Sequence, residues 1–557
     1  MNWQNPIGFA TADAVELAVV LLLCGIWLVA RGRIGTLATR FASRTIPCMI
    51  VLAAMPVVLR LLLLGRYPIP EPAVADDFSY VLLADTLRHF RFANPPHPMS
   101  QFFETFFVLQ EPTYSSIYPL GQGLAIATGW LVFGHPWAGI ALAVGALCAL
   151  CYWMLRAWTN PGWSLWGGIL AVFLFGPLSQ WMNSYWGGAV SGCAGCLVFG
   201  SLPRLLVAAR LRHVLLLGAG LALQMLTRPF ESIPLMAAVA LFLLPEWRVW
   251  RVLLPRMAPS LLLVVAAVGL TALHNRAVTG NAATTPYQLS RTQYGVPTTF
   301  TFQPLPQPQW RLTREQGLDY QIQSTVHGAG PETLGTYLAR LGTRIRYFRF
   351  YLLPPLYLAV PFFLLLLRRF RFLWVVMTIC GFLLCANLYP YFYTHYIAAV
   401  SSLFILVGVA GLERLSRIRI RCQPVGDQAA AVIACVCAAH CLFWYGLHLF
   451  VPAELTASLA RYETWDAINH GDPEGRIEVR RRLMQSPGKQ LVFVRYGPQH
   501  TFKEWVYNEA QIDEAKIVWA RDLGSEENDK LRQYYSDRSA WLLEPDARPW
   551  RLVKYEP

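Results

Sequence analysis

Two adjacent carboxylates, Asp76 and Asp77, are the residues whose type and position most directly predict chemistry. They follow an apolar run that ends near residue 65, so we expect them where a membrane meets water. A partly desolvated carboxylate has a raised pKa and can act as a base near neutral pH, or it can bind a divalent cation through its oxygens. Alternatively, one of the two begins the helix that continues through 80–85, which leaves the other for function.

Membrane helices are the elements that must position this doublet. The chain has 557 residues, of which 55% are apolar and only 14% are charged, and long apolar runs recur along most of its length. The net charge of +14 does not indicate nucleic-acid binding, because the arginines cluster in short loops between apolar runs. The predicted fold class is therefore an α-helical polytopic membrane protein.

Twelve apolar runs have the length of membrane-spanning helices. They cover 14–30, 46–65, 137–156, 163–179, 186–202, 214–227, 232–246, 257–273, 350–367, 372–387, 394–412 and 429–451. The apolar segment 120–134 is punctuated by glycine and proline, and we expect it to be a helix lying in the membrane interface.

Arginine clusters predict the orientation, because basic residues near the ends of spans stay on the cytoplasmic side. The clusters lie in the loops 31–45, 203–213, 247–256, 368–371 and 414–421, which all fall on one side of the predicted arrangement. The first long loop (66–136), the second (274–349) and both termini then face the periplasm of a bacterial inner-membrane protein. The polar residues of these segments share one compartment.

The chain changes in composition after the membrane domain, 1–451. The tail 452–557 contains Lys, Asp and Glu, with strand-like runs at 491–495 and 516–519 and a helical pattern near 504–514. We predict a small periplasmic α/β domain that serves as a lid or docking module. No residue in the tail predicts catalysis.

Two cysteine pairs have the CxxC spacing of metal and redox sites. Cys148 and Cys151 form one pair, and Cys193 and Cys196 form the other. Both pairs fall inside apolar runs, so we expect them to be packing residues.

The first long loop carries several short motifs after its acidic doublet. These are Ala84-Asp85-Thr86-Leu87, Glu111-Pro112 and Tyr118-Pro119-Leu120-Gly121, followed by an apolar stretch at 131–134. Together they resemble the first periplasmic loop of C-type (GT-C) glycosyltransferases of the family 39-like group, similar to protein O-mannosyltransferases and the lipid A aminoarabinose transferase. The resemblance covers about residues 70–135, is diffuse over the other helices and is absent from the tail.

This resemblance implies that one aspartate of the loop is the catalytic base, a role that falls on Asp76 or Asp77. The family has a second acidic residue after the next helix pair, but the turn 181–188 contains none. We expect Glu104 or Glu111 to take its place. The implied reaction is inverting transfer of a sugar from a polyprenyl-phosphate donor to an envelope glycan, lipid or protein acceptor. The only cofactor considered is a divalent cation at the doublet.

Ten residues are the candidates for substrate contact. They are Glu104, Glu111, Tyr118, Tyr185, Trp186, Arg228, Arg276, Arg291, His395 and Tyr396. By the resemblance, Arg228 can bind a lipid phosphate through bidentate hydrogen bonds, and Tyr185 and Trp186 can stack on a sugar. The alternatives are an ion pair of Arg228 with Glu231 or an interfacial anchor, and an aromatic belt. For His395 the alternative is a structural role, and for Arg276 an exposed loop charge.

Two other function classes are considered. A transporter usually has ionisable residues or broken helices at the midplane, in two matching halves, and the predicted spans are nearly free of charge and show no repeat. An O-antigen polymerase-like enzyme would have its essential arginines in a large late periplasmic loop. The loop 274–349 contains Arg276 and Arg291, so this alternative stays open.

Overall fold

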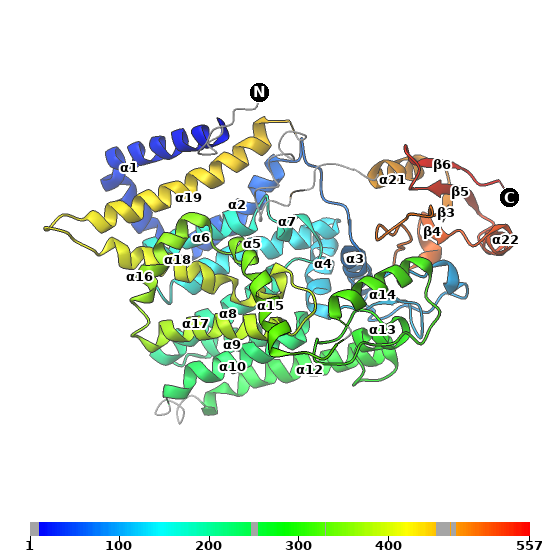
Figure 1. The fold of residues 1–557 in the computed structure, drawn as a ribbon, viewed down its shortest axis with the longest axis horizontal. Coiled ribbons are helices and arrows are strands. Elements are labelled where there is room, and N and C mark those ends of the chain that lie inside the picture. The colour runs from blue at the N-terminus through cyan, green and yellow to red at the C-terminus, as the bar shows by residue number, and fades with distance from the viewer. Residues whose placement is uncertain (1–10, 247–253, 329, 453–467, 469–474, 557) are drawn as a thin grey trace.

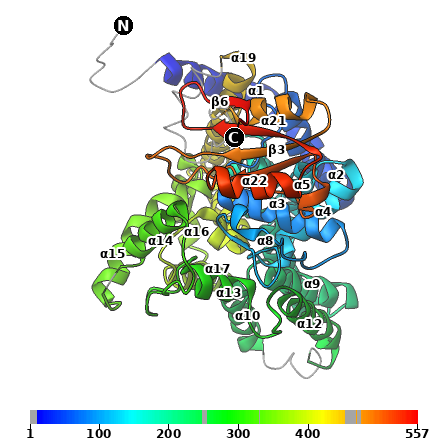
Figure 2. The ribbon, with the colours of Figure 1, turned by 90° about the vertical axis from the view of Figure 1, so that its right-hand side faces the viewer.

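A computed structural model describes residues 11–246, 254–328, 330–452, 468 and 475–556. Most of the chain is a bundle of helices, and the two long loops and the C-terminal sheet gather at one end of it, at the right of Figure 1. Figure 2 shows this end from the front, with the C-terminal sheet over α3 (Ala75–Arg88).

Every predicted span contains helix. The corresponding helices are α1 (Thr11–Ser43), α2 (Thr45–Leu62), α5 (Pro136–Leu155), α6 (Pro161–Phe175), α8 (Ala189–Val207), α9 (Leu211–Thr227), α10 (Pro229–Leu243), α12 (Ala258–Thr279), η5 with α16 (Pro354–Leu364), α17 (Phe370–Ala386), α18 (Ser401–Ser416) and α19 (Val425–Phe450). Among the described residues, seven helices are long and apolar enough to cross a membrane, and the other predicted spans are shorter apolar helices.

One predicted loop is helical instead. The segment 31–45 does not leave the helix after the first apolar run, because α1 continues to Ser43. No proline interrupts this segment, and a helix can extend past its apolar part into water without losing backbone hydrogen bonds. Within the predicted cytoplasmic loop 247–256, Arg248 and Arg251 lie outside the described residues.

The first loop forms the two predicted helices and a short hairpin. Helix α3 carries the acidic doublet in its first turn. Helix α4 (Leu120–Phe133) corresponds to the predicted interfacial helix. Between them lie the 3₁₀ turn η1 (Ser100–Phe102) and the antiparallel strands β1 (Val108–Leu109) and β2 (Ser115–Ser116).

The second loop contains three short helices, α13 (Pro286–Tyr294), α14 (Arg314–His327) and α15 (Leu334–Arg344), and then the 3₁₀ segment η4 (Ile345–Phe350). A threonine caps each of the three helices: Thr285, Thr313 and Thr333 each accept a hydrogen bond from the third residue of the helix that follows. These caps begin helices in a polar segment that has little apolar surface to bury.

The C-terminal segment contains a mixed sheet in the order β4 (Ile517–Arg521), β3 (Lys489–Val494), β5 (Arg538–Glu544), β6 (Arg551–Lys554). Strand β3 is parallel to both β4 and β5, and β6 is antiparallel to β5. Helices α21 (Arg476–Gln485) and α22 (Ser525–Tyr534) precede and connect the strands. Both predicted strands are confirmed.

The helix predicted near 504–514 is wrong. Only Ile512–Glu514 forms a 3₁₀ turn there, and 504–511 has no regular structure. The Asn508 side chain makes two hydrogen bonds of 2.8 Å to the backbone of Trp519 in β4, while Trp505 and Val506 are buried beside the sheet. Tertiary pairing to the strand therefore replaces local helical bonding.

The C-terminal segment packs directly on α3. Leu82 belongs to a core shared with the sheet, and Phe78 stacks on Tyr507 with ring centroids 4.1 Å apart. Asp85 accepts a 2.7 Å hydrogen bond from the backbone N–H of Ala510. Helix α3 is thus held between the membrane bundle and the C-terminal sheet.

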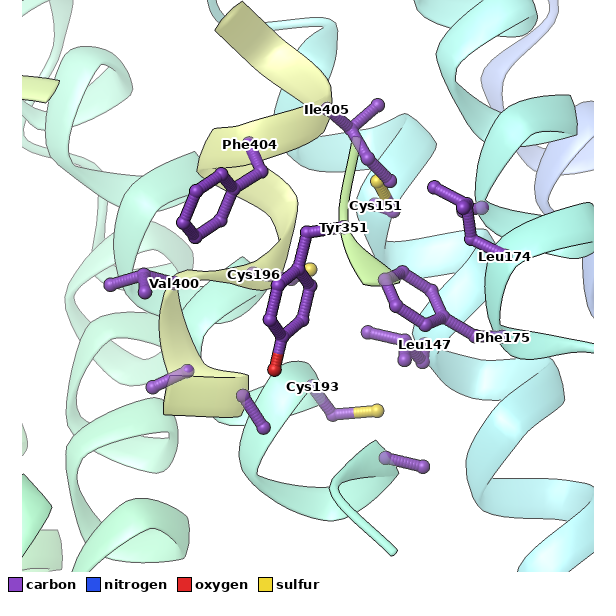
Figure 3. Packing of buried hydrophobic residues seen from close by; sticks show 14 of the residues in the cluster. Leu147, Cys151, Leu174, Phe175, Cys193, Cys196, Tyr351, Val400, Phe404 and Ile405 are labelled. Atoms are coloured by element: carbon purple, nitrogen blue, oxygen red, sulfur yellow. The ribbon is translucent and has the colours of Figure 1, made fainter. Parts of the chain in front are cut away.

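The bundle core contains the predicted packing cysteines. All four residues of the CxxC pairs are buried free thiols. Figure 3 shows Cys151, Cys193 and Cys196 among apolar and aromatic side chains such as Phe175 and Tyr351. Their role as small packing residues is confirmed.

Helix α4 lies against α5 through two glycines. A Cβ on Gly139 would lie 2.2 Å from the carbonyl oxygen of Ala125, and a Cβ on Gly129 would lie 2.0 Å from the backbone nitrogen of Gly139. Only hydrogen fits at these positions, so the glycines set the distance between α4 and α5.

We expect Gly139→Val to destabilise the protein by about 3 kcal/mol, at the upper end for overpacking because the obstructing atoms are backbone. Thermal unfolding of the purified protein in detergent measures the effect. The matched control is Gly381→Val in α17, where a Cβ would meet nothing within 4 Å. Equal melting temperatures for the two variants would contradict the packing described.

Candidate active site

One cavity of about 270 Å³ lies where the first loop, the α9–α10 turn, α12, α13 and the 3₁₀ segment η6 (Thr394–Val400) meet. Its walls mix aromatic, apolar and charged side chains. Seven of the twelve candidate residues predicted from the sequence line it: Asp76, Tyr118, Trp186, Arg228, Arg291, His395 and Tyr396.

Asp76 faces this cavity from the first turn of α3. One of its carboxylate oxygens accepts a hydrogen bond of 2.5 Å from the Tyr118 hydroxyl. Tyr80 lies one turn further along the same helix face, and its ring stacks on Tyr118 at 4.2 Å. Burial raises the pKa of Asp76 above its ordinary value, and the Tyr118 hydrogen bond and the charge of Arg228 offset only part of the rise. The result is a half-buried carboxylate at the cavity wall whose protonated form is favoured relative to that of a free aspartate.

Asp77 points the other way and has a structural role. It is 2% exposed, and its oxygens accept backbone hydrogen bonds from Ala73 at 3.1 Å, Val74 at 3.5 Å and Tyr185 at 2.6 Å. Burial raises the pKa of Asp77 to about 7, although these hydrogen bonds favour its charged form. Asp77 fixes the start of α3 against the turn that contains Tyr185, so the geometry favours Asp76 as the functional member of the doublet.

Arg228 supplies positive charge to the same cavity. Its guanidinium forms an ion pair with Glu231 at 2.6 Å and lies 4.6 Å from the centre of the Tyr396 ring. Burial disfavours the charge, but Glu231 and the surrounding tyrosines outweigh it and raise the pKa of Arg228. The predicted pair with Glu231 is present, and Arg228 still lines the cavity. Pairing and ligand contact are therefore compatible.

The Tyr-Pro-x-Gly motif brings α4 up to this arginine. A Cβ on Gly121 would lie 2.1 Å from Oγ1 of Thr227, the residue before Arg228. The glycine therefore lets the start of α4 lie against the α9–α10 turn, and Tyr118 just before it reaches Asp76.

Arg291 and His395 complete the predicted residues of the cavity wall. The Arg291 guanidinium donates hydrogen bonds to the carbonyls of Pro297 at 3.0 Å and Thr298 at 3.3 Å. The His395 ring contacts Trp186 edge-on with centroids 4.8 Å apart. Arg291 is held in place by its own loop and adds a second positive charge to the cavity.

Five predicted residues do not line the cavity: Asp77, Glu104, Glu111, Tyr185 and Arg276. The Glu104 carboxylate accepts hydrogen bonds from Gln316 at 3.0 Å and Tyr294 at 3.4 Å, so the second loop holds it elsewhere. Glu111 and Arg276 are exposed, and the Tyr185 hydroxyl donates to the carbonyl of Pro70. The acid that accompanies Asp76 in the cavity is Glu231, and neither Glu104 nor Glu111 takes that place.

Several lining residues were not among the predictions. Tyr80 had a signal, since it lies four residues after Asp76 and shares its helix face. His274 and Asn275 are a polar pair at the end of the apolar helix α12, which is also visible in the sequence. Tyr287 and Tyr389 had no distinguishing signal among 24 tyrosines.

The two carboxylates of the doublet have different hydrogen-bond partners, and a divalent cation between them stays a prediction. Asp76 accepts a hydrogen bond from the Tyr118 hydroxyl, whereas Asp77 accepts one from the backbone N–H of Tyr185. In the part of the chain that the structure describes, no group of three or more His, Cys, Asp or Glu side chains is arranged to hold a metal ion.

Known structures were compared with the chain. No family model matches the sequence, and the curated proteins give no match. The chain is similar in structure to ArnT from Cupriavidus metallidurans. The apo form has a TM-score of 0.48 and 11% identity, and the undecaprenyl phosphate complex 0.46 and 12%, each over 89% of this chain and 92% of the other.

A second similar structure is the oligosaccharyltransferase AglB from Archaeoglobus fulgidus in complex with an inhibitory peptide and a dolichol-phosphate. It has a TM-score of 0.39 and 11% identity over 90% of this chain and 70% of the other. ArnT, a lipid A aminoarabinose transferase, is among the enzymes that the first-loop motifs resemble. Because the identities and TM-scores are this low, function is inferred from the site itself.

The two aspartates should differ in their effect on stability. We expect Asp77→Ala to lower the unfolding free energy by about 1–3 kcal/mol, because three backbone N–H groups lose their buried acceptor. Asp76→Asn should change it much less, since the amide keeps an oxygen for Tyr118. Thermal unfolding in detergent compares the variants, and a larger loss for Asp76→Asn would reverse the assignment.

Proposed function

We propose that this chain is a membrane glycosyltransferase that moves a sugar from a polyprenyl-phosphate donor to an acceptor hydroxyl, with Asp76 as the base. The observation that carries the proposal is that Asp76 and Arg228 line one cavity. A base for the attacking hydroxyl and a cation for the departing phosphate are the two groups that such a transfer needs. The motifs of the first loop, which resemble those of C-type glycosyltransferases, support the same reading.

In the proposed reaction, Asp76 takes the proton of the acceptor hydroxyl as its oxygen bonds to the anomeric carbon of the donor. The bond between that carbon and the phosphate oxygen breaks, and its electron pair stays with the lipid phosphate. Arg228 and Arg291 stabilise the anion as it forms, in a site where low dielectric strengthens the interaction. A single displacement inverts the anomeric configuration.

Aromatic side chains are suited to hold the transferred sugar. Trp186, His395 and Tyr396 form adjacent parts of the wall, with centroids 4.8 Å and 4.6 Å apart. Apolar faces of a pyranose or furanose pack on such rings while its hydroxyls reach polar groups. Asn275 and Gln288 line the same cavity and can supply these polar groups.

We further propose that the cavity faces the periplasm of a bacterial inner membrane. The support is the placement of arginine clusters in the loops opposite to those that build the cavity. The acceptor is then an envelope glycan, lipid or protein. The lipid tail of the donor lies in the bilayer, beside the apolar helices that flank the cavity.

A polymerase-like enzyme is the second candidate, because Arg291 of the second loop lines the cavity while Arg276 does not. Such an enzyme would depend on its loop arginine and would have no essential base at position 76. Variants at Asp76 and at Arg291 therefore separate the two candidates.

Replacing Asp76 tests the base directly. We expect Asp76→Asn to reduce sugar transfer in membrane vesicles by at least about 100-fold, the lower bound of general-base contributions. Transfer is measured with the extracted polyprenyl-phosphate sugars of the host. The control is Asp529→Asn in α22, which replaces a surface carboxylate that is paired with Arg532 and should transfer normally. Undiminished transfer by Asp76→Asn, with loss in Arg291→Gln, would replace the proposal by the polymerase-like alternative.

The pH profile should report Asp76. The base must be ionised and burial raises its pKa, so transfer should fall as the pH drops through a value above the ordinary 3.9 or so of aspartate. Tyr118→Phe removes a hydrogen bond that favours the ionised form, and the acidic limb should move to higher pH. Transfer rates from pH 4 to 9 measure both effects. An unchanged limb in Tyr118→Phe would show that a different group sets the profile.

A further inference from the structure

A second cavity lies in the C-terminal segment, at the carboxyl ends of strands β3 and β5. Its volume is about 760 Å³, and it is an open cleft. One wall is the loop 495–499, which directly follows β3, and the other is 544–548, at the end of β5 and just beyond it. The proposed transfer assigns no role to this cleft.

The strand order places a crevice at this point. The chain passes from β3 to its neighbour β4 on one side and then returns through α22 to β5 on the other side of β3. The loops after β3 and β5 therefore leave the sheet in opposite directions and open a gap between them. In open α/β sheets, ligands bind at such a switch point, outside the carboxyl ends of the strands. Topology and cavity independently indicate one site.

Both walls of the cleft are held in place. The Asp546 carboxylate accepts hydrogen bonds of 2.7 Å from the backbone N–H of Gly497 and from Nδ1 of His500, which ties the two loops together. Arg314 of α14 donates to the carbonyl of Gly497 at 2.9 Å and to that of Pro498. The cleft is therefore preformed.

The charges of the lining are balanced. Arg495 and Arg548 come from different walls, while the acidic residues Glu544 and Asp546 both belong to the wall 544–548. Part of this charge is already paired, because Arg495 forms an ion pair with Asp522 and Glu544 forms one with Arg551 at 3.3 Å. Arg495 also lies 3.8 Å from Glu544, so a free anion or cation gains little from these groups. A neutral polyhydroxyl ligand can use both kinds of group, because each hydroxyl donates and accepts hydrogen bonds. Gln499 adds an amide with both functions.

We infer that this cleft binds a neutral saccharide, and that the saccharide is part of the acceptor. The second statement rests on the proposed function; the first does not. Helix α14 connects the cleft to the first loop, because Arg314 contacts the cleft loop while Gln316 donates a hydrogen bond to Glu104 of the first loop. The C-terminal sheet lies at the same end of the molecule as α3, the helix that begins with the acidic doublet (Figure 2).

Saturation-transfer NMR on the full-length protein in nanodiscs tests the inference, with neutral di- to tetrasaccharides of glucose, galactose and mannose as probes. Inorganic phosphate and glucosamine represent the anionic and cationic classes. We expect at least one neutral oligosaccharide to bind, and Glu544→Gln and Arg548→Gln each to weaken it about tenfold, as for one hydrogen bond to a charged group. The control Glu526→Gln, exposed on α22, should bind as the wild type does.

Two outcomes would overturn the inference: no neutral oligosaccharide binds, or binding is unaffected by both cleft variants. Phosphate or glucosamine binding that these variants abolish would assign the cleft to a charged ligand instead. The binding measurement needs no transfer and is repeated in Asp76→Asn. If a saccharide binds at the cleft but Asp76→Asn transfers sugar normally, the saccharide site stands and the proposed reaction is refuted. If no saccharide binds but Asp76→Asn loses transfer, the proposed reaction stands and the saccharide site is refuted.

Discussion

The candidate site depends on how α3 begins. A carboxylate can remain in a water-poor cavity only if the helix that carries it is fixed, because otherwise it would turn toward solvent and regain its hydration. Asp77 provides the fixation by accepting backbone hydrogen bonds from the residues before the helix and from Tyr185. The neighbouring residue Asp76 is then turned toward the cavity. The buried Asp77 thus holds Asp76 at the cavity wall.

The remaining contacts of α3 reinforce this arrangement from two sides. Tyr80 and Leu83 pack toward the bundle, where a Cβ on Gly123 would lie 2.6 Å from Leu83. Phe78 and Asp85 bind the C-terminal segment. The C-terminal segment is therefore more than a cover, since it forms part of the packing that fixes the helix bearing Asp76.

The charges of the cavity explain why a transfer that releases an anion suits it. Two arginines, Arg228 and Arg291, face two acids, Asp76 and Glu231, so the empty cavity is nearly balanced. In the proposed reaction Asp76 takes the acceptor's proton, and one negative charge then disappears from the wall. The positive charge left over faces the phosphate at the moment when that group becomes the leaving anion. Proton transfer and anion stabilisation thus support each other.

The sequence by itself determined the helical membrane class, the helices α3 and α4, two strands of the C-terminal sheet and the acidic doublet, because each is encoded by local periodicity or by adjacent residues. Only the tertiary structure decided that Asp76 rather than Asp77 faces the cavity. Both residues lie in the first turn of α3, and the rotation of that helix about its axis is set by long-range partners such as Tyr185. The same holds for 504–511, where pairing with β4 outweighs a local helical pattern. Residues 76, 228, 291 and 395 meet through packing across the chain, and no local pattern states which distant residues will be neighbours.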